Sequence, residues 1–113
     1  MIKKNLLLFI LFSVSFVGFT QTKNTSFSKE VLIKAAKEIM NSTGICALIT
    51  QDKNGISRVR MMDPFPPEEN LAVWFGTNPT SRKVAQIKQN KLVTIYYRDK
   101  DDSGYVTIHG KAT

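Results

Sequence analysis

Four cationic residues stand in two short stretches of the sequence that could bind an anion. Arg58 and Arg60 are two positions apart, and Arg82 and Lys83 directly follow Ser81. In a β-strand, alternation would place Arg58 and Arg60 on one face. Two adjacent guanidinium groups can grip a phosphate or a carboxylate through paired hydrogen bonds. The same pattern suits a solvated outer surface, so the arginine pair alone leaves both interpretations open.

The second stretch is a turn containing Gly76 and Thr77 that leads into a short helix beginning near Ser81. Helix N-termini bind anions because they present free N–H groups and the positive end of the helix dipole. Arg82 and Lys83 in a first turn oppose that dipole, an arrangement that an intervening anion would favour. A capped helix with incidental surface cations is the alternative. Taken together, the two stretches predict a phosphate pocket.

The elements that must position these residues follow from apolar spacing and turn residues. Apolar residues at helical spacing between Val31 and Met40 predict an amphipathic helix, capped by a hydroxyl in the segment 26–28 and ended by Gly44. A second, short helix is expected from Thr80 or Ser81 to about Lys88.

Five strands are expected, with a hairpin turn at residues 51–55 and a proline-containing loop at 63–70. In that turn, Asn54 and Gly55 are expected to supply positive φ angles. This order predicts a mainly β protein, an antiparallel β-barrel with flanking helices. The chain ends partway through its last strand, so either another chain covers this edge or the barrel is C-terminally truncated. The expected strands are 45–50, 56–62, 71–75, 92–98 and 105–109.

The first 20 residues predict a secretory signal peptide. A basic start with Lys3 and Lys4 precedes an apolar run at 6–19 and then small polar residues. The run has 14 residues, whereas a membrane-spanning helix needs about 20. Cleavage near Thr20 would leave a mature domain of residues 21–113, exported to the periplasm or secreted, with no stable membrane span. An uncleaved N-terminal anchor is the alternative.

Composition restricts the class of protein further. The chain has 113 residues, enough for one domain, and a formal net charge of +7. A single Cys and a single His exclude a disulfide framework and an ordinary zinc cluster, so no metal is expected. A nucleic-acid-binding barrel would also be basic. However, the cations cluster instead of lining a groove, and export directs the chain away from nucleic acid.

Several of these motifs resemble the pyridoxamine 5'-phosphate oxidase-like split-barrel flavoproteins, and the resemblance covers most of residues 29–113. Its most specific part is Thr77-Asn78 followed by Ser81-Arg82-Lys83, and the Arg-x-Arg-Met pattern is closest to the general-stress-type branch. The motifs are Arg58-Val-Arg60-Met-Met, Trp74-Phe-Gly-Thr-Asn78, Ser81-Arg-Lys83, Ile95-Tyr-Tyr97 and Tyr105-Val-Thr-Ile-His-Gly110.

The resemblance implies a six-stranded antiparallel split barrel that forms a homodimer with FMN at the interface. Arginines of the strand and the Ser-Arg-Lys segment would hold the phosphate. The residues after the arginines and those of the turn would border the ribityl chain and the ring. Tyr105 stands where the oxidase has a flavin-binding Gln. The implied cofactor-binding residues are Arg58, Arg60, Met61, Met62, Gly76, Thr77, Ser81, Arg82, Lys83 and Tyr105.

The sequence also departs from the oxidase itself. Asp63 stands where the oxidase carries a substrate-binding Lys, and the oxidase's remaining substrate residues lie in a C-terminal part that this sequence lacks. We therefore expect an exported FMN-binding protein with flavin-dependent oxidoreductase activity on an unknown substrate, and not true pyridoxamine phosphate oxidation. The alternative is a non-catalytic flavin- or haem-binding protein on the same barrel.

Overall fold

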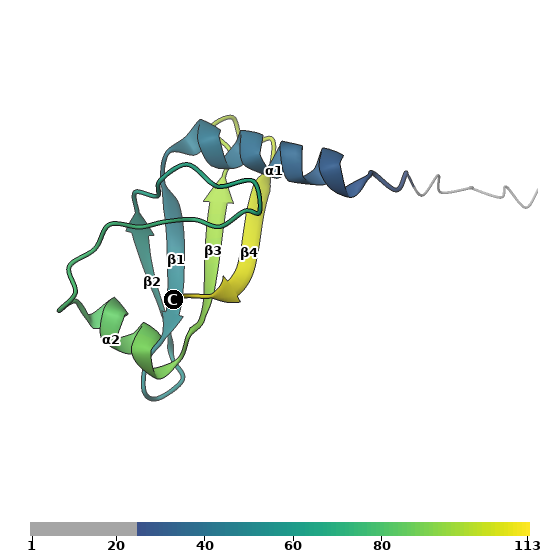
Figure 1. Cartoon of the computed structure of the whole chain (residues 1–113). Coiled ribbons are helices and arrows are strands. Elements are labelled where there is room, and N and C mark those ends of the chain that lie inside the picture. Colours follow the sequence, from purple (N-terminus) through teal and green to yellow (C-terminus); the bar gives the residue numbers. More distant parts are fainter. Residues whose placement is uncertain (1–24) are drawn as a thin grey trace, which may run out of the picture.

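A computed structural model describes residues 25–113, where a four-stranded antiparallel sheet is flanked by two helices (Figure 1). The strands lie in the order β2-β1-β3-β4 across the sheet. The expected signal peptide, residues 1–20, lies outside the described residues. Along the chain the elements are α1 (Lys29–Thr43), β1 (Cys46–Gln51), β2 (Ser57–Met62), α2 (Arg82–Gln89), β3 (Leu92–Arg98) and β4 (Tyr105–Lys111).

Helix α1 begins and ends as its sequence predicts. The hydroxyl of Ser28 accepts a hydrogen bond from the Val31 N–H at 3.3 Å, and Gly44 ends the helix in the left-handed conformation. Met40 points into the core and is almost fully buried. Near the C-terminal end of α1, the Ser42 hydroxyl donates to a carboxylate oxygen of Asp99 at 2.6 Å. This hydrogen bond ties α1 to the turn between β3 and β4.

The β1–β2 hairpin forms where predicted, but its turn differs in detail. Only Gly55 has a positive φ, so the expectation for Asn54 is wrong. The reason is the side chain of Asp52, whose Oδ1 accepts hydrogen bonds from the backbone N–H groups of Asn54 and Ile56. This side-chain cap closes the turn with a single left-handed residue.

One face of the sheet carries the core and the other is open. Cys46 and Leu48 of β1 and Ile95 and Tyr97 of β3 are buried on the inner face, together with Met40 of α1. The thiol of Cys46 and the hydroxyl of Tyr97 lie together there, and burial raises the pKa of both groups. The connection between β2 and α2 runs over this inner face (Figure 1) and contributes Leu71, Val73 and Phe75 to the core.

The strand expected at 71–75 does not form. A single bridge joins Pro64 to Phe75, and the Phe65 N–H donates to the Trp74 carbonyl at 2.9 Å. Two physical causes limit the ladder. The neighbouring prolines have no N–H to donate, and Leu71 adopts a left-handed φ of 66° that ends extended pairing. Trp74 is instead held by its indole N–H, which donates to Glu68 at 2.7 Å.

The predicted antiparallel, mainly β architecture is confirmed, with four strands in place of the expected five. Helix α1 lies across one end of the strands, whereas α2 lies at the other end, near the β1–β2 turn (Figure 1). Neither of the helices described for residues 25–113 is long and apolar enough to cross a membrane.

Candidate anion-binding site

Strand β2 presents its two arginines on the inner face, as the alternation predicts. Arg58 lies opposite Thr50 of β1 and Arg60 lies opposite Leu48, and both of these partners are buried. The guanidinium groups therefore start from the same face, two residues apart. Their side-chain partners nevertheless differ, and this difference decides which of the two arginines is available to bind an anion.

The charge of Arg58 is matched within the hairpin. Its Nε and Nη2 donate to Oδ2 of Asp52 at 2.9 and 2.7 Å, a two-fold contact with one carboxylate. These hydrogen bonds, with smaller contributions from the backbone N–H groups of the turn, hold the pKa of Asp52 below its usual range. Arg58 thus closes the turn and carries little unbalanced charge.

Among residues 25–113, Arg60 instead donates hydrogen bonds to neutral side chains. Its Nη1 donates to Oγ1 of Thr50 at 2.8 Å, and its Nη2 donates to Oε1 of Gln86 in α2 at 3.1 Å. Burial lowers the pKa of Arg60, and the positive charge of nearby Arg82 lowers it further. Within residues 25–113, Arg60 has no ion pair with a carboxylate. A partly buried cation beside a second cation favours an added anion.

The start of α2 supplies that second cation and an unused hydroxyl. Ser81 is the N-cap residue with an extended backbone, yet its side chain accepts no capping hydrogen bond. Its Oγ is buried and has no hydrogen-bond partner among the described residues. Arg82 and Lys83 follow in the first turn, which contains no acidic residue. A buried hydroxyl without a partner is costly, so this one marks a place for a further polar group.

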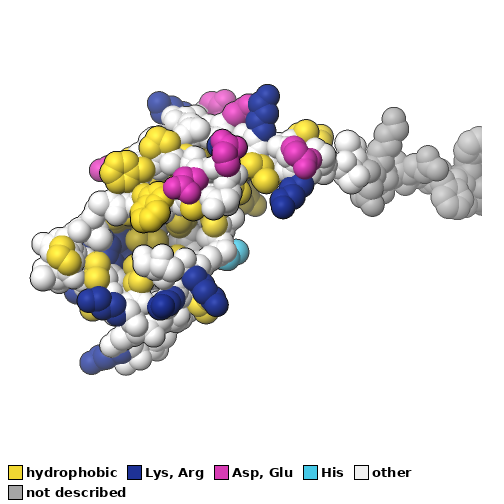
Figure 2. All heavy atoms as spheres, viewed as in Figure 1, with side chains coloured by type: hydrophobic (Ala, Val, Ile, Leu, Met, Phe, Trp, Pro, Cys, Tyr) yellow, Lys and Arg dark blue, Asp and Glu magenta, His cyan; other side chains and the backbone are white. Residues whose placement is uncertain are grey.

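These groups together fit a phosphate. Arg60 and the Ser81-Arg82-Lys83 segment bring three cations and a hydroxyl to the N-terminus of α2, where helix N–H groups also favour an anion. In the view of Figure 2, Asp and Glu side chains lie among Lys and Arg in the half of the molecule near α1, whereas the charged side chains visible at the end with α2 are Lys and Arg. Phosphate oxygens accept from guanidinium, ammonium and hydroxyl groups alike.

The other predicted cofactor-binding residues are distributed over different parts of the molecule. Met62 is half-buried on the inner face, on the same side of β2 as Arg60, and Gly76 and Thr77 lie in the exposed segment before α2. Met61 lies on the opposite, outer face and is 62% exposed.

Tyr105 is also on the outer face, at the start of edge strand β4 and 67% exposed. It packs on Tyr96 with ring centroids 5.8 Å apart. Within one chain, the structure therefore does not bring Met61 or Tyr105 to Arg60.

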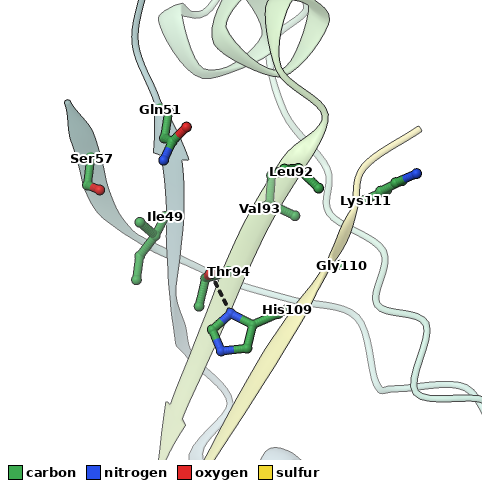
Figure 3. Close-up of a pocket in the computed structure, with 9 residues that line it drawn as sticks. All are labelled: Ile49, Gln51, Ser57, Leu92, Val93, Thr94, His109, Gly110 and Lys111. Carbon is green, nitrogen blue, oxygen red and sulfur yellow. Dashed lines mark hydrogen bonds between the residues drawn. The ribbon is translucent and has the colours of Figure 1, made fainter. Parts of the chain in front are cut away.

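The outer face also holds an open hollow of about 420 Å³, shown in Figure 3. Ile49 and Leu92 form part of its apolar lining, and His109 and Thr94 contact each other there, with Nδ1 and Oγ1 2.9 Å apart. None of the predicted cofactor-binding residues lines it. In the described part of the chain, His, Cys, Asp and Glu side chains form no group of three that could hold a metal ion.

Two residues of the site did not emerge from the sequence, although signals for both exist. Gln86 follows Arg82 by four positions, so the two share one face of α2. Thr50 continues the alternation of Cys46 and Leu48 in β1, which places its hydroxyl on the inner face opposite the arginines. Neither residue was identified from the sequence, because a neutral polar residue adds nothing to the pattern of charges.

Comparison with known proteins places the chain in a family. Residues 32–113 match the family model described as pyridoxamine 5'-phosphate oxidase like. A search of the curated proteins finds no match.

Solved structures share the fold. A Clostridium acetobutylicum protein related to general stress protein 26 of B. subtilis, of the pyridoxinephosphate oxidase family, superposes with a TM-score of 0.64 at 21% identity, over 74% of this chain and 59% of that one. PhzG from Burkholderia lata, solved with tetrahydrophenazine-1-carboxylic acid, gives 0.60 at 21% identity, over 73% and 43%.

A nimc/nima family protein from Clostridium acetobutylicum gives a TM-score of 0.55 at 26% identity, over 70% of this chain and 53% of that one. The chain thus spans between 43% and 59% of the length of these three structures. The predicted split-barrel fold is confirmed by these likenesses.

Proposed function

Because the chain belongs to the pyridoxamine 5'-phosphate oxidase-like family, we propose that it binds FMN, with the phosphate held between β2 and the start of α2. Flavin binding is common in this family. The observation that carries the proposal is the buried, partnerless Oγ of Ser81 beside cations that no carboxylate in residues 25–113 neutralises. A phosphate monoester would satisfy both at once.

The chain's own residues would divide the work of binding. Arg60 and Arg82 would balance the phosphate charge, with Ser81 donating its hydroxyl hydrogen and Lys83 adding a further cation. Met62, Gly76 and Thr77 would border the ribityl chain and the ring. Arg58 would act mainly through the hairpin, since Asp52 already matches its charge.

Bound FMN would supply the redox chemistry, while the protein supplies binding, orientation and control of water access. We propose a flavin-dependent oxidoreductase acting on a substrate other than pyridoxamine phosphate. Asp63 supports this distinction, because a carboxylate at the end of β2 would repel the phosphate of that substrate.

We further propose that the chain is a homodimer that pairs through the outer face of its sheet. Val59, Met61 and Tyr105 are each more than 60% exposed on this face, and exposed apolar clusters mark interaction surfaces. The open hollow lies on the same face and would be closed by the second copy. Pairing would also let Tyr105 and Met61 reach a flavin bound to the other subunit.

The predicted signal peptide leads us to propose export to the periplasm or beyond. The FMN-binding protein would then act outside the cytoplasm. Export of the full chain, compared with a chain that lacks residues 1–20, tests this part separately.

The test of FMN binding compares two ligands that differ only in the phosphate. The purified chain is titrated with FMN and with riboflavin, and bound flavin is followed by absorption and fluorescence. We expect FMN to bind at least about tenfold more tightly, the equivalent of one charge-assisted hydrogen bond. Equal affinity for both ligands, or binding of neither, would overturn the proposal.

Two matched variants locate the phosphate. Arg60→Met should reduce FMN affinity by about tenfold to a hundredfold and leave riboflavin affinity unchanged, because it removes an unneutralised cation. Arg58→Met, on the same strand and face, should change FMN affinity by less than about threefold, a few tenths of a kcal/mol. NADPH oxidation by the FMN-loaded chain then separates an oxidoreductase from a flavin carrier.

A further inference from the structure

The guanidinium group of Arg60 is part of a closed triangle of hydrogen bonds that joins three elements. Arg60 in β2 donates to Thr50 in β1 and to Gln86 in α2. The third side is a hydrogen bond from the Thr50 hydroxyl to the same Oε1 of Gln86, at 2.6 Å. Thr50 is only 1% exposed, and it is the one buried polar residue of the described chain.

This triangle orients a cation without neutralising it. A carboxylate in the place of Gln86 would match the charge of Arg60, as Asp52 does for Arg58. The amide and hydroxyl oxygens instead accept two of the five guanidinium N–H bonds and leave the net positive charge in place. Since side-chain ordering opposes binding, an arginine already fixed in the free protein loses less entropy when an anion arrives.

Gln86 also links the two halves of the phosphate site. It lies one helical turn after Arg82, so the bond from Arg60 to Gln86 sets the start of α2 against β2. The bond from the Thr50 hydroxyl to the same Gln86 oxygen ties α2 to β1 as well. The bond from Arg60 also holds this residue near Arg82, whose positive charge lowers the pKa of Arg60.

We propose that Thr50 and Gln86 are positioning residues that hold the Arg60 guanidinium for the cofactor phosphate, and that they thereby set selectivity for phosphorylated over unphosphorylated flavin. The inference rests on the proposed function and deepens it. Neither residue needs to touch the flavin ring. Their effect is therefore confined to the phosphate half of the ligand.

The experiment measures the ratio of riboflavin to FMN dissociation constants in the full chain. Gln86→Glu keeps the acceptor oxygen and the side-chain size but places a carboxylate on Arg60. We expect it to lower the ratio by tenfold or more, since an internal counter-ion competes with the phosphate. Gln86→Leu removes the acceptor without adding charge, and we expect a smaller loss of about threefold to tenfold.

Matched variants separate positioning from general charge and packing effects. Gln89→Glu makes the same change on an exposed residue of the same helix and should leave the ratio unchanged within about twofold. Thr50→Ser keeps the hydroxyl and should retain the wild-type ratio, whereas Thr50→Val should lower it.

The outcomes are distinguishable. A wild-type chain that binds FMN and riboflavin equally overturns the proposed function and the positioning role together. A selective wild type with an equally selective Gln86→Glu variant overturns the positioning role alone. Equal loss of both ligands in Gln86→Glu and Gln86→Leu also overturns it, because that pattern belongs to a structural role.

Discussion

The two helices begin with the same residue in the same conformation, yet they treat it in opposite ways. Ser28 and Ser81 are both N-cap serines, with φ and ψ of −65° and 155° at α1 and −71° and 153° at α2. Ser28 caps its helix with its side chain, and the first turn contains Glu30 beside Lys29. Ser81 leaves its hydroxyl without a partner in the described chain, and cations follow it.

Under the proposed function, this contrast marks the place where the molecule gives up stability for a ligand. A side-chain cap contributes about 1 kcal/mol, and a well-placed charge in the first turn contributes about 0.3–1 kcal/mol. Helix α1 uses both contributions. Helix α2 uses neither, and a bound anion would restore both. Departures from local rules are expected at functional sites.

Reversing the first-turn charges at both helices should have the largest effect. Arg82→Glu places a carboxylate near Arg60, so we expect FMN affinity to fall by about a hundredfold or more, while the free protein gains about 0.5–1 kcal/mol of stability. FMN titration and urea unfolding of the same preparation measure the two quantities.

The mirror variant at α1 is Glu30→Lys. It should lower the free energy of unfolding by about 0.3–1 kcal/mol and leave FMN affinity unchanged. The comparison between the helices breaks down if Arg82→Glu destabilises the free chain, or if both variants weaken FMN to the same extent.

Removing the two serine hydroxyls should have a smaller effect. We expect Ser28→Ala to cost about 1 kcal/mol of stability, because a used cap is lost, with no change in FMN affinity. Ser81→Ala should leave the stability of the free chain unchanged or slightly raised, since it removes an unsatisfied buried group. It should weaken FMN by about threefold to tenfold. Thermal unfolding with and without FMN measures both the stability and the FMN affinity of each variant. Equal losses of stability in the two variants would contradict the difference between the caps.

Acid dependence of the β1–β2 turn should give the smallest effect. The hydrogen bond from Arg58, with smaller help from the turn N–H groups, lowers the pKa of Asp52 in the folded chain. A lowered folded-state pKa stabilises the fold above the ordinary aspartate pKa, and this stabilisation is lost as the pH falls through the lowered value. The melting temperature of the wild type should therefore fall more steeply on acidification than that of Asp52→Asn.

This variant also sharpens the distinction between the arginines. Asp99, whose pKa is lowered chiefly by the Ser42 hydroxyl and then by Ser103, is present in both proteins, so their difference isolates Asp52. With its carboxylate partner removed, Arg58 should raise FMN affinity by no more than about threefold. Parallel melting curves from neutral to acid pH would rule out the Asp52 contribution.

Local signals in the sequence predicted much of the fold and less of the site. The ends of α1 at Ser28 and Gly44 were predicted correctly, because an N-cap and a left-handed C-cap depend only on residues close in sequence. The strand expected at 71–75 failed because Leu71 has a left-handed backbone and because the segment that faces it contains prolines. The alternation of apolar residues does not show which segment faces a strand or which φ angle its residues adopt.

The same limit applies to the proposed phosphate site. Alternation correctly placed Arg58 and Arg60 on one face of β2, but it could not separate them. That separation depends on a turn that brings Asp52 back to Arg58 and on a helix that brings Gln86 to Arg60. Neither contact follows from the alternation of residues within one strand, because each joins β2 to a residue outside it.

Trp74 gives this molecule an optical reporter of its own. It is the single tryptophan of the chain, and its bond to Glu68 holds the indole on the connection that leads from β2 toward α2. Indole emission overlaps flavin absorption, so excitation energy would pass to a ring seated near this connection. Loading could therefore be followed by the loss of ultraviolet-excited light from an unlabelled sample, without a dye or an engineered probe.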